Sequence, residues 1–187
     1  DNFIFNNINL INQKKLFKIF ENIKVDIIIH LAAQPGVRLS LKEPQKYFDN
    51  NVYVHNNILH FSYIKKVKRL LYASSSSVYG NSKVPFKENY KLGNPESLYA
   101  STKIMCENLS YAYSYNFNLK TIGLRFFTVY GPYGRPDMAY YDFTKKIIKN
   151  EKITLFNFGK NVRDFTYIDD LINAVSNLAL YEEHNLF

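Results

Sequence analysis

The stretch Val25-Asp26-Ile27-Ile28-Ile29-His30-Leu31 decides the fold, because it is mostly apolar and rich in β-branched residues. A short run of this composition is typical of a strand buried on both faces of a parallel sheet. A second such run follows at residues 69–73, after a long segment with helical spacing. Strands that alternate with helices in this way predict an α/β fold with a parallel sheet.

The other expected elements follow from the same two patterns. Short apolar runs predict strands at residues 3–5, 25–31, 69–73, 119–126 and 153–156. Apolar positions at helical spacing predict helices at residues 13–22, 44–66, 99–115, 138–150 and 167–180. Pro44 suits the first turn of its helix.

Three loops attract attention because each directly follows a predicted strand: residues 32–36, 74–80 and 127–135. The second loop opens an irregular stretch that runs to residue 98, and a loop of that length in a compact chain is usually functional. In open parallel sheets, ligands bind at the carboxyl ends of the strands. We therefore expect the three loops to converge at one edge of the sheet.

Composition narrows the classes of function. The 187 residues are 47% hydrophobic, which argues against disorder, and the net charge is +8. The basic residues are scattered without a nucleic-acid-binding motif, so we expect no nucleic-acid partner. Cys106 is the only cysteine, which excludes an intrachain disulfide and fits a reducing, cytoplasmic location. No apolar run approaches the ~20 residues of a membrane helix. We therefore expect no membrane insertion. No metal-ligand cluster is visible either, so we expect no bound metal.

Tyr99 and Lys103 are four residues apart in a predicted helix, which puts them on one face, one turn apart. A fixed cation next to a phenol favours the phenolate, which can take a proton from a sugar hydroxyl. The spacing alone is weak, since many surface helices contain it by chance. Residues 74–77, four serines after a buried strand, add specificity because their hydroxyls can bind a substrate oxygen and pass a proton.

Five segments carry a resemblance to a known family. They are HLAAQPGVR at residues 30–38, YASSSSVYG at 72–80, SLYASTK at 97–103, GLRFFTVYGPYGRPDM at 123–138 and RDFTYIDD at 163–170. With them the chain resembles the extended short-chain dehydrogenases/reductases, the NAD-dependent nucleotide-sugar epimerases and dehydratases, and within these it is most similar to UDP-glucuronate 4-epimerases. The resemblance implies a Rossmann-like, doubly wound parallel sheet with part of a small substrate-binding region.

The resemblance also implies roles around NAD. Tyr99 matches the catalytic base, Lys103 its electrostatic partner and a ligand of the nicotinamide ribose, and Ser75 the catalytic serine or threonine. Residues 31–33 (Leu31, Ala32 and Ala33) match the loop that runs along the cofactor. Asn51 matches an asparagine on the nicotinamide side.

The substrate side is implied in the same way. Ser76 and Ser77 would line the sugar pocket, where the dehydratase branch has an acidic pair, so two serines favour an epimerase. Thr128 and Arg135 match the pocket for the sugar carboxylate, a role that suits a planar, permanently charged fork. Arg163 matches the arginine that pairs with the diphosphate of UDP. Arg135 can alternatively be a solvent-exposed loop residue, and Arg163 can pair with Asp164 or Asp170.

The implied activity is 4-epimerisation of a UDP sugar, UDP-glucuronate to UDP-galacturonate, by transient oxidation at C4 with NAD. UDP-glucose 4-epimerase and UDP-glucuronate decarboxylase are the alternatives within the family. The family usually forms homodimers through two helices, here residues 44–66 and 99–115, so the full-length parent is expected to be a homodimer.

One family feature is missing: no glycine precedes Gly36, so the Gly-rich turn that holds the cofactor pyrophosphate is absent. The chain also stops at Phe187, before the rest of the sugar-binding region that the resemblance implies. We therefore expect a chain truncated at both ends that lacks the first βαβ unit. Residues 1–126 are expected to form the truncated NAD-binding domain. Residues 127–187 would form a partial nucleotide-sugar-binding region interleaved with the last Rossmann elements. A non-catalytic fragment remains an alternative to an active epimerase.

Overall fold

The structure is a computed structural model and describes residues 2–90 and 92–181. The chain divides into two compact units, one running to Arg125 and the other comprising Phe126–Tyr181.

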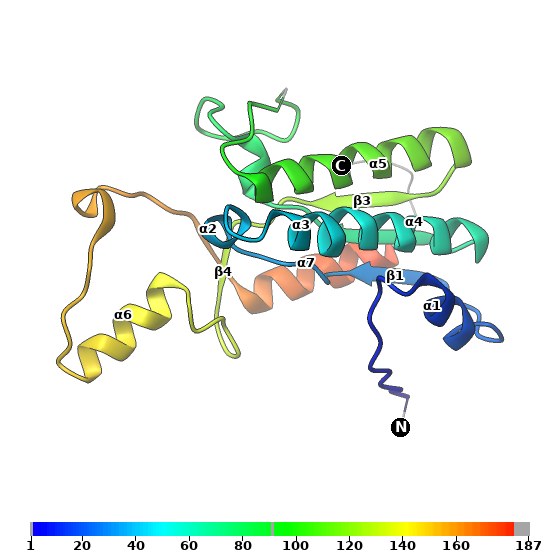
Figure 1. The fold of residues 1–187 in the computed structure, drawn as a ribbon, viewed down its shortest axis with the longest axis horizontal. Helices are drawn as coiled ribbons and strands as arrows, with labels where there is room; N and C mark the ends of the chain where they lie inside the picture. Colours follow the sequence, from blue (N-terminus) through cyan, green and yellow to red (C-terminus); the bar gives the residue numbers. More distant parts are fainter. Residues whose placement is uncertain (1, 91, 182–187) are drawn as a thin grey trace. The chain divides into compact units, whose positions relative to one another are not determined.

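The first unit is built on a three-stranded parallel sheet of β1 (Ile27–His30), β2 (Arg69–Ala73) and β3 (Thr121–Leu124), in the order β1-β2-β3 (Figure 1). Ile28 pairs with Leu70, and Leu71 pairs with Ile122. All three strands run in the same direction, so their carboxyl ends meet at one edge. The predicted α/β fold with a parallel sheet is confirmed.

The helices of this unit are α1 (Gln13–Ile19), α2 (Val37–Ser40), α3 (Pro44–Tyr47), α4 (Val54–Ile64) and α5 (Leu98–Phe117), with the 3₁₀ turn η2 (Ser76–Tyr79). The long helix α5 begins at Ser97, whose hydroxyl accepts a hydrogen bond from the Ala100 N–H. It ends at Asn118 in the left-handed conformation. Both ends are therefore specified locally.

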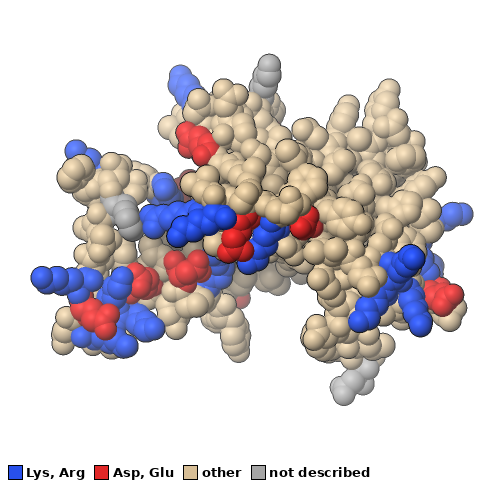
Figure 2. All heavy atoms as spheres, viewed as in Figure 1, with Lys and Arg blue, Asp and Glu red and all other residues tan. Residues whose placement is uncertain are grey.

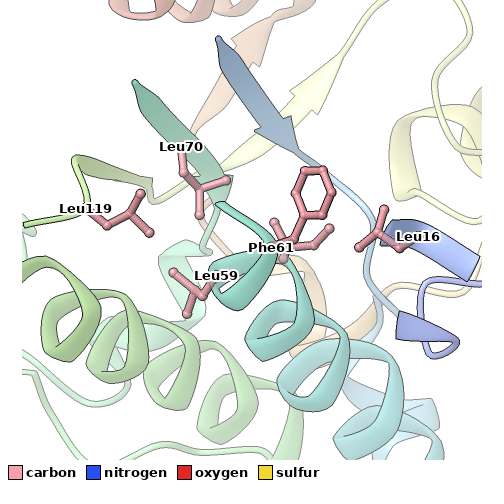
Figure 3. Packing of buried hydrophobic residues seen from close by; sticks show 6 residues of the cluster. Leu16, Leu59, Phe61, Leu70 and Leu119 are labelled. Atoms are coloured by element: carbon pink, nitrogen blue, oxygen red, sulfur yellow. The ribbon is translucent and has the colours of Figure 1, made fainter. Parts of the chain in front are cut away.

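A cluster of buried apolar side chains joins these elements (Figure 3). Leu59 and Phe61 of α4 meet Leu70 of β2, with Leu16 from α1 and Leu119 just before β3. Full burial of a side chain of this size contributes about 1.5–3 kcal/mol each. The cluster fixes α4 against the sheet and so sets where the strand ends lie.

The second unit contains a two-stranded parallel sheet of β4 (Thr128–Tyr130) and β5 (Phe165–Tyr167). It also contains α6 (Ala139–Ile148), the turn η3 (Phe156–Gly159) and α7 (Ile168–Leu180). Gly131 has φ +139°, and a Cβ there would lie 2.4 Å from the side chain of Ile168, so only glycine fits. Acidic and basic side chains are mixed around α6 in Figure 2.

Several sequence expectations were wrong. Residues 3–5 form no strand; Phe3 is 80% exposed, and a strand needs a partner. Residues 153–156 form no strand either. The helix expected at residues 44–66 is interrupted by a π-helical segment η1 (Phe48–Tyr53). Residues 37–40 form the short helix α2, which was not foreseen. The loop expected at residues 127–135 contains β4, and β5 was not foreseen.

Strand β1 also differs from expectation. Ile29 is 46% exposed, so the strand is not buried on both faces. Within the residues that the structure describes, β1 pairs with β2 alone and therefore forms an edge. The apolar face of Ile29 thus has no cover in this part of the chain.

Candidate active site

The site of the first unit lies at the carboxyl ends of β1 and β2. Residues 31–36 follow β1, and the serine run 74–77 follows β2. Parallel pairing places both segments at the same edge of the sheet. The third expected loop, residues 127–135, belongs to the second unit.

Lys103 connects helix α5 to the end of β2. Its Nζ donates a hydrogen bond of 2.8 Å to the carbonyl oxygen of Ala73, the last residue of that strand. The same Nζ lies 6.0 Å from the ring centroid of Tyr99. Lys103 is only 5% exposed, and burial lowers the pKa of its ammonium group. A buried cation is thus fixed beside the phenol.

Tyr99 is half-buried one turn before Lys103 and is contacted by a second tyrosine. The ring of Tyr47 meets it edge-on, with centroids 6.2 Å apart. The hydroxyl of Tyr47 lies 2.6 Å from the carbonyl oxygens of both Pro35 and Gly36. Tyr47 is fully buried and links the loop after β1 to the tyrosine of the site. Sequence reasoning missed it, and no local signal distinguishes it from an ordinary core tyrosine.

The serines after β2 have different environments. Ser75 is buried and caps η2, its Oγ accepting a 3.2 Å hydrogen bond from the Ser77 N–H. Ser74 is also buried, and its hydroxyl donates to Oε1 of Glu107. Ser76 and Ser77 are half-buried. The run is therefore held rigidly at its start.

Glu107 belongs to a polar network that sequence reasoning missed. It lies on α5 one turn beyond Lys103, on the same face. The guanidinium of Arg125 donates to both of its oxygens, at 3.0 and 2.9 Å. Arg125 also faces the ring of Tyr79 at 4.9 Å and donates to the Glu88 carbonyl at 3.2 Å. The bond to Glu107 raises the pKa of Arg125.

Asn51 ties the loop after β1 to α5. Its Oδ1 accepts from the Gln34 N–H at 2.7 Å, and its Nδ2 donates to the Gln34 carbonyl and to Oγ1 of Thr102, at 3.2 and 3.0 Å. The side chain is 2% exposed. In the loop, Leu31 and Ala32 are exposed and Ala33 is half-buried. The side chain of Asn51 thus holds the protein backbone.

Two buried histidines lie beneath this edge. The rings of His30, at the end of β1, and His55 stack with centroids 5.4 Å apart. Nε2 of His55 lies 2.8 Å from Oγ of Ser110. Burial, aided by the charge of Lys103, lowers the pKa of His30 to about 4; burial and then His30 lower that of His55 to about 3. Both rings are neutral at pH 7.

The second unit carries the remaining predicted residues. Thr128 is half-buried at the start of β4. The Arg135 guanidinium binds the carboxylate of Asp137, with Nε–Oδ1 at 3.0 Å and Nη2–Oδ2 at 2.5 Å. Arg163 is exposed and donates to the Val162 carbonyl. Within the described chain, Arg163 forms no ion pair with Asp164 or Asp170, so that alternative was wrong.

Clusters of His, Cys, Asp and Glu that could hold a metal ion were not found among residues 2–90 and 92–181. In the same part of the chain, no helix has the length and apolar character needed to cross a membrane.

Comparison with known proteins identifies the family. The family described as "NAD dependent epimerase/dehydratase family" matches residues 1–185. The chain belongs to this epimerase/dehydratase family. Its similarity to solved members extends to the fold: UDP-glucuronic acid 4-epimerase from Bacillus cereus, in complex with UDP-glucuronic acid and NAD, superimposes with a TM-score of 0.87. The identity is 35%, over 96% of this chain and 56% of that chain.

Family members with related sequences include Protein CapI of Staphylococcus aureus, 47% identical over 96% of this chain and 54% of that protein. UDP-glucuronate 4-epimerase 4 of Arabidopsis thaliana is 46% identical over 86% of this chain and 37% of that protein. The chain thus spans about half the length of CapI and less of the plant enzyme. The expected family and Rossmann-like fold class are confirmed.

Proposed function

We propose that the protein carrying this chain is an NAD-dependent 4-epimerase that interconverts UDP-glucuronate and UDP-galacturonate. The observation that carries the proposal is the buried Lys103 ammonium beside Tyr99 at the carboxyl end of β2. A cation held next to a phenol favours the phenolate, which is the base that oxidation of a sugar hydroxyl needs. The relatedness to UDP-glucuronate 4-epimerases supports the same activity.

The donors around Lys103 fit NAD. An ammonium group has three N–H donors, and within the described residues its only hydrogen bond goes to the Ala73 carbonyl. Two donors therefore remain, which suits a ribose hydroxyl and the oxygen of Tyr99. Leu31, Ala32 and Ala33 would lie along the cofactor, with Asn51 supporting their loop through Gln34. Bound NAD would supply the capacity to oxidise C4 of the sugar and to reduce it again.

The chain's own residues would carry out the proton transfers. Tyr99, as phenolate, removes the proton of the 4-hydroxyl, and Lys103 stabilises the negative charge before this step. Ser75, fixed at the start of η2, hydrogen-bonds the same sugar oxygen. After the sugar has turned over in the pocket, Tyr99 returns the proton to that oxygen. The configuration at C4 is then inverted without net consumption of the cofactor.

The choice of a uronate rests on side chains that carry charge or hydroxyl groups. Arg135 presents a fork that matches a carboxylate, with Thr128 as a second contact. Arg163 would bind the diphosphate. Ser76 and Ser77 supply neutral hydroxyls, whereas expulsion of water would need acidic groups. We assign NAD binding to residues 1–126 and the nucleotide sugar mainly to residues 127–187, and we propose a cytoplasmic homodimer.

A turnover assay tests the proposal. The purified protein, at its natural full length and supplied with NAD, should convert UDP-glucuronate to UDP-galacturonate, followed by NMR of the sugar C4 proton. Tyr99→Phe should lower kcat about a thousandfold, because the general base is removed. Tyr111→Phe, an exposed tyrosine on the same helix, is the matched control. Failure to turn over UDP-glucuronate together with rapid turnover of UDP-glucose would contradict the uronate assignment.

A further inference from the structure

Arg135 and Asp137 lie within one tight turn of the second unit. The Met138 N–H donates to the Arg135 carbonyl at 3.3 Å, which closes a turn over four residues. Pro136 occupies the second position, where its ring restricts the backbone. The two charged side chains therefore leave the positions on either side of Pro136, on a restrained backbone. Their pairing requires little additional ordering.

The way in which the two side chains pair leaves part of the arginine unused. A guanidinium has five N–H donors in a planar fork. Asp137 takes the lateral edge, accepting from Nε and Nη2. Within the described residues, Nη1 makes no hydrogen bond, and the arginine side chain is 46% exposed. The end-on edge, formed by Nη1 and the second hydrogen of Nη2, is therefore open to a second carboxylate.

We propose that Asp137 is a positioning residue for substrate specificity, which grips the lateral edge of Arg135 and presents its end-on edge to the carboxylate of a uronic acid nucleotide sugar. The inference rests on the role proposed above for Arg135. A neutral sugar has no group that can make a charge-assisted pair with this edge. Asp137 thus contributes to the choice of substrate without touching it.

Charge and geometry indicate that Asp137 positions Arg135 and does not compete with the substrate carboxylate for it. Asp137 stays ionised, because the hydrogen bonds from Arg135 lower the pKa of its carboxyl group. Displacing it would cost both bonds of the existing pair, whereas end-on binding keeps them. A long, exposed arginine loses several rotatable bonds when it binds a ligand, and holding the fork in advance reduces that entropy cost. Asp137 is itself 64% exposed, so its replacement should not impair folding.

The test compares four variants in the full-length protein. Asp137→Asn should raise the KM and Kd for UDP-glucuronate about tenfold, the effect of losing a charged hydrogen bond, and leave kcat unchanged. The Kd for UDP-glucose should not change. Asp137→Glu, which keeps the carboxylate, should recover part of the affinity. Asp142→Asn is the matched control, since it removes another carboxylate of the second unit, half-buried, that pairs with a cation, Lys146, at 2.7 Å.

Unchanged or tighter binding of UDP-glucuronate by Asp137→Asn would overturn the inference. Unchanged binding would mean that Asp137 does not contribute, and tighter binding that it competes with the substrate for Arg135. Arg135→Ala separates this failure from failure of the proposed function. If Arg135→Ala impairs binding of UDP-glucuronate and Asp137→Asn does not, only the role of Asp137 is disproved. Normal uronate binding by Arg135→Ala removes the proposed role of Arg135 and this inference with it.

Discussion

The guanidinium of Arg125 holds both carboxylate oxygens of Glu107, through Nε at 3.0 Å and Nη2 at 2.9 Å. The pair connects the residue that follows β3 to the helix that carries Tyr99 and Lys103. Through Ser74 it also reaches the strand end one residue before Ser75. Both partners are largely shielded from solvent, so each depends on the other for compensation of its charge.

Glu107→Ala should lower the free energy of unfolding by about 3 kcal/mol, because it leaves the Arg125 charge shielded and unpaired. Urea denaturation of the purified protein measures this loss. Lys68→Ala, which breaks an exposed pair with Asp26, should cost less than about 1 kcal/mol. Equal losses of unfolding free energy in the two variants would show that the shielded Glu107 pair stabilises the fold no more than an exposed pair does.

Acid should destabilise the fold through His30 and His55. Their folded-state pKa values, about 4 and about 3, lie below the value near 6.5 of an unfolded histidine. The unfolded chain therefore binds protons that the folded chain excludes. Below about pH 6.5, the free energy of unfolding should fall by about 1.4 kcal/mol per pH unit for each histidine, until the folded-state pKa is reached. Urea titrations at several pH values measure the slope.

A histidine substitution provides the control for that slope. His55→Gln removes one titrating ring and should reduce the slope, whereas His60→Gln, on the half-buried side of the same helix, should leave it unchanged. If His55→Gln keeps the slope of the wild type, the acid sensitivity comes from other groups.

The parts of the fold that could be predicted are those with a strong local pattern. Strand β2 and helix α5 were expected within two residues of their bounds, because one is a short apolar run and the other has apolar positions at helical spacing. Residues 3–5 and β4 show the limit. Both are three residues long, and only the presence of a partner distinguishes them. Strand β4 pairs with β5, and 34 residues separate the two strands.

The candidate site also has a part that local sequence patterns predict and a part that they do not. The spacing of Tyr99 and Lys103 alone predicts a shared helix face. The same spacing reaches Glu107, yet its importance depends on Arg125, which another element supplies. Tyr47 and Asn51 act on the loop after β1 from 11 to 17 residues away, through a helix with a π-helical interruption. Such contacts depend on tertiary packing, which local patterns do not encode.

Asn51→Ala should destabilise the protein and weaken its affinity for NAD. The change removes the acceptor of the Gln34 N–H and the partner of Thr102 from a buried position, at a cost of about 2 kcal/mol. Denaturation and calorimetric titration with NAD measure the two effects. Asn50→Ala is the neighbouring control, because its amide donates to the exposed Lys46 carbonyl; it should change stability by less than about 0.5 kcal/mol.

Lys103→Met should lower kcat by about a hundredfold or more, because the cation that favours the Tyr99 phenolate is lost. Burial lowers the pKa of Lys103, so its ammonium group should lose its proton at a less alkaline pH than that of an exposed lysine. The wild-type rate should therefore begin to fall at that less alkaline pH. A pH–rate profile measures this limb, and the variant should lack it.

Lys65→Met is the matched control for Lys103→Met, because Lys65 also donates to backbone carbonyls, those of Phe20 and Glu21, and lies at the far end of α4. Its kcat and pH profile should stay those of the wild type. An alkaline limb that persists in Lys103→Met would assign that limb to another group. A normal kcat in Lys103→Met would remove the lysine from the proposed catalytic machinery altogether.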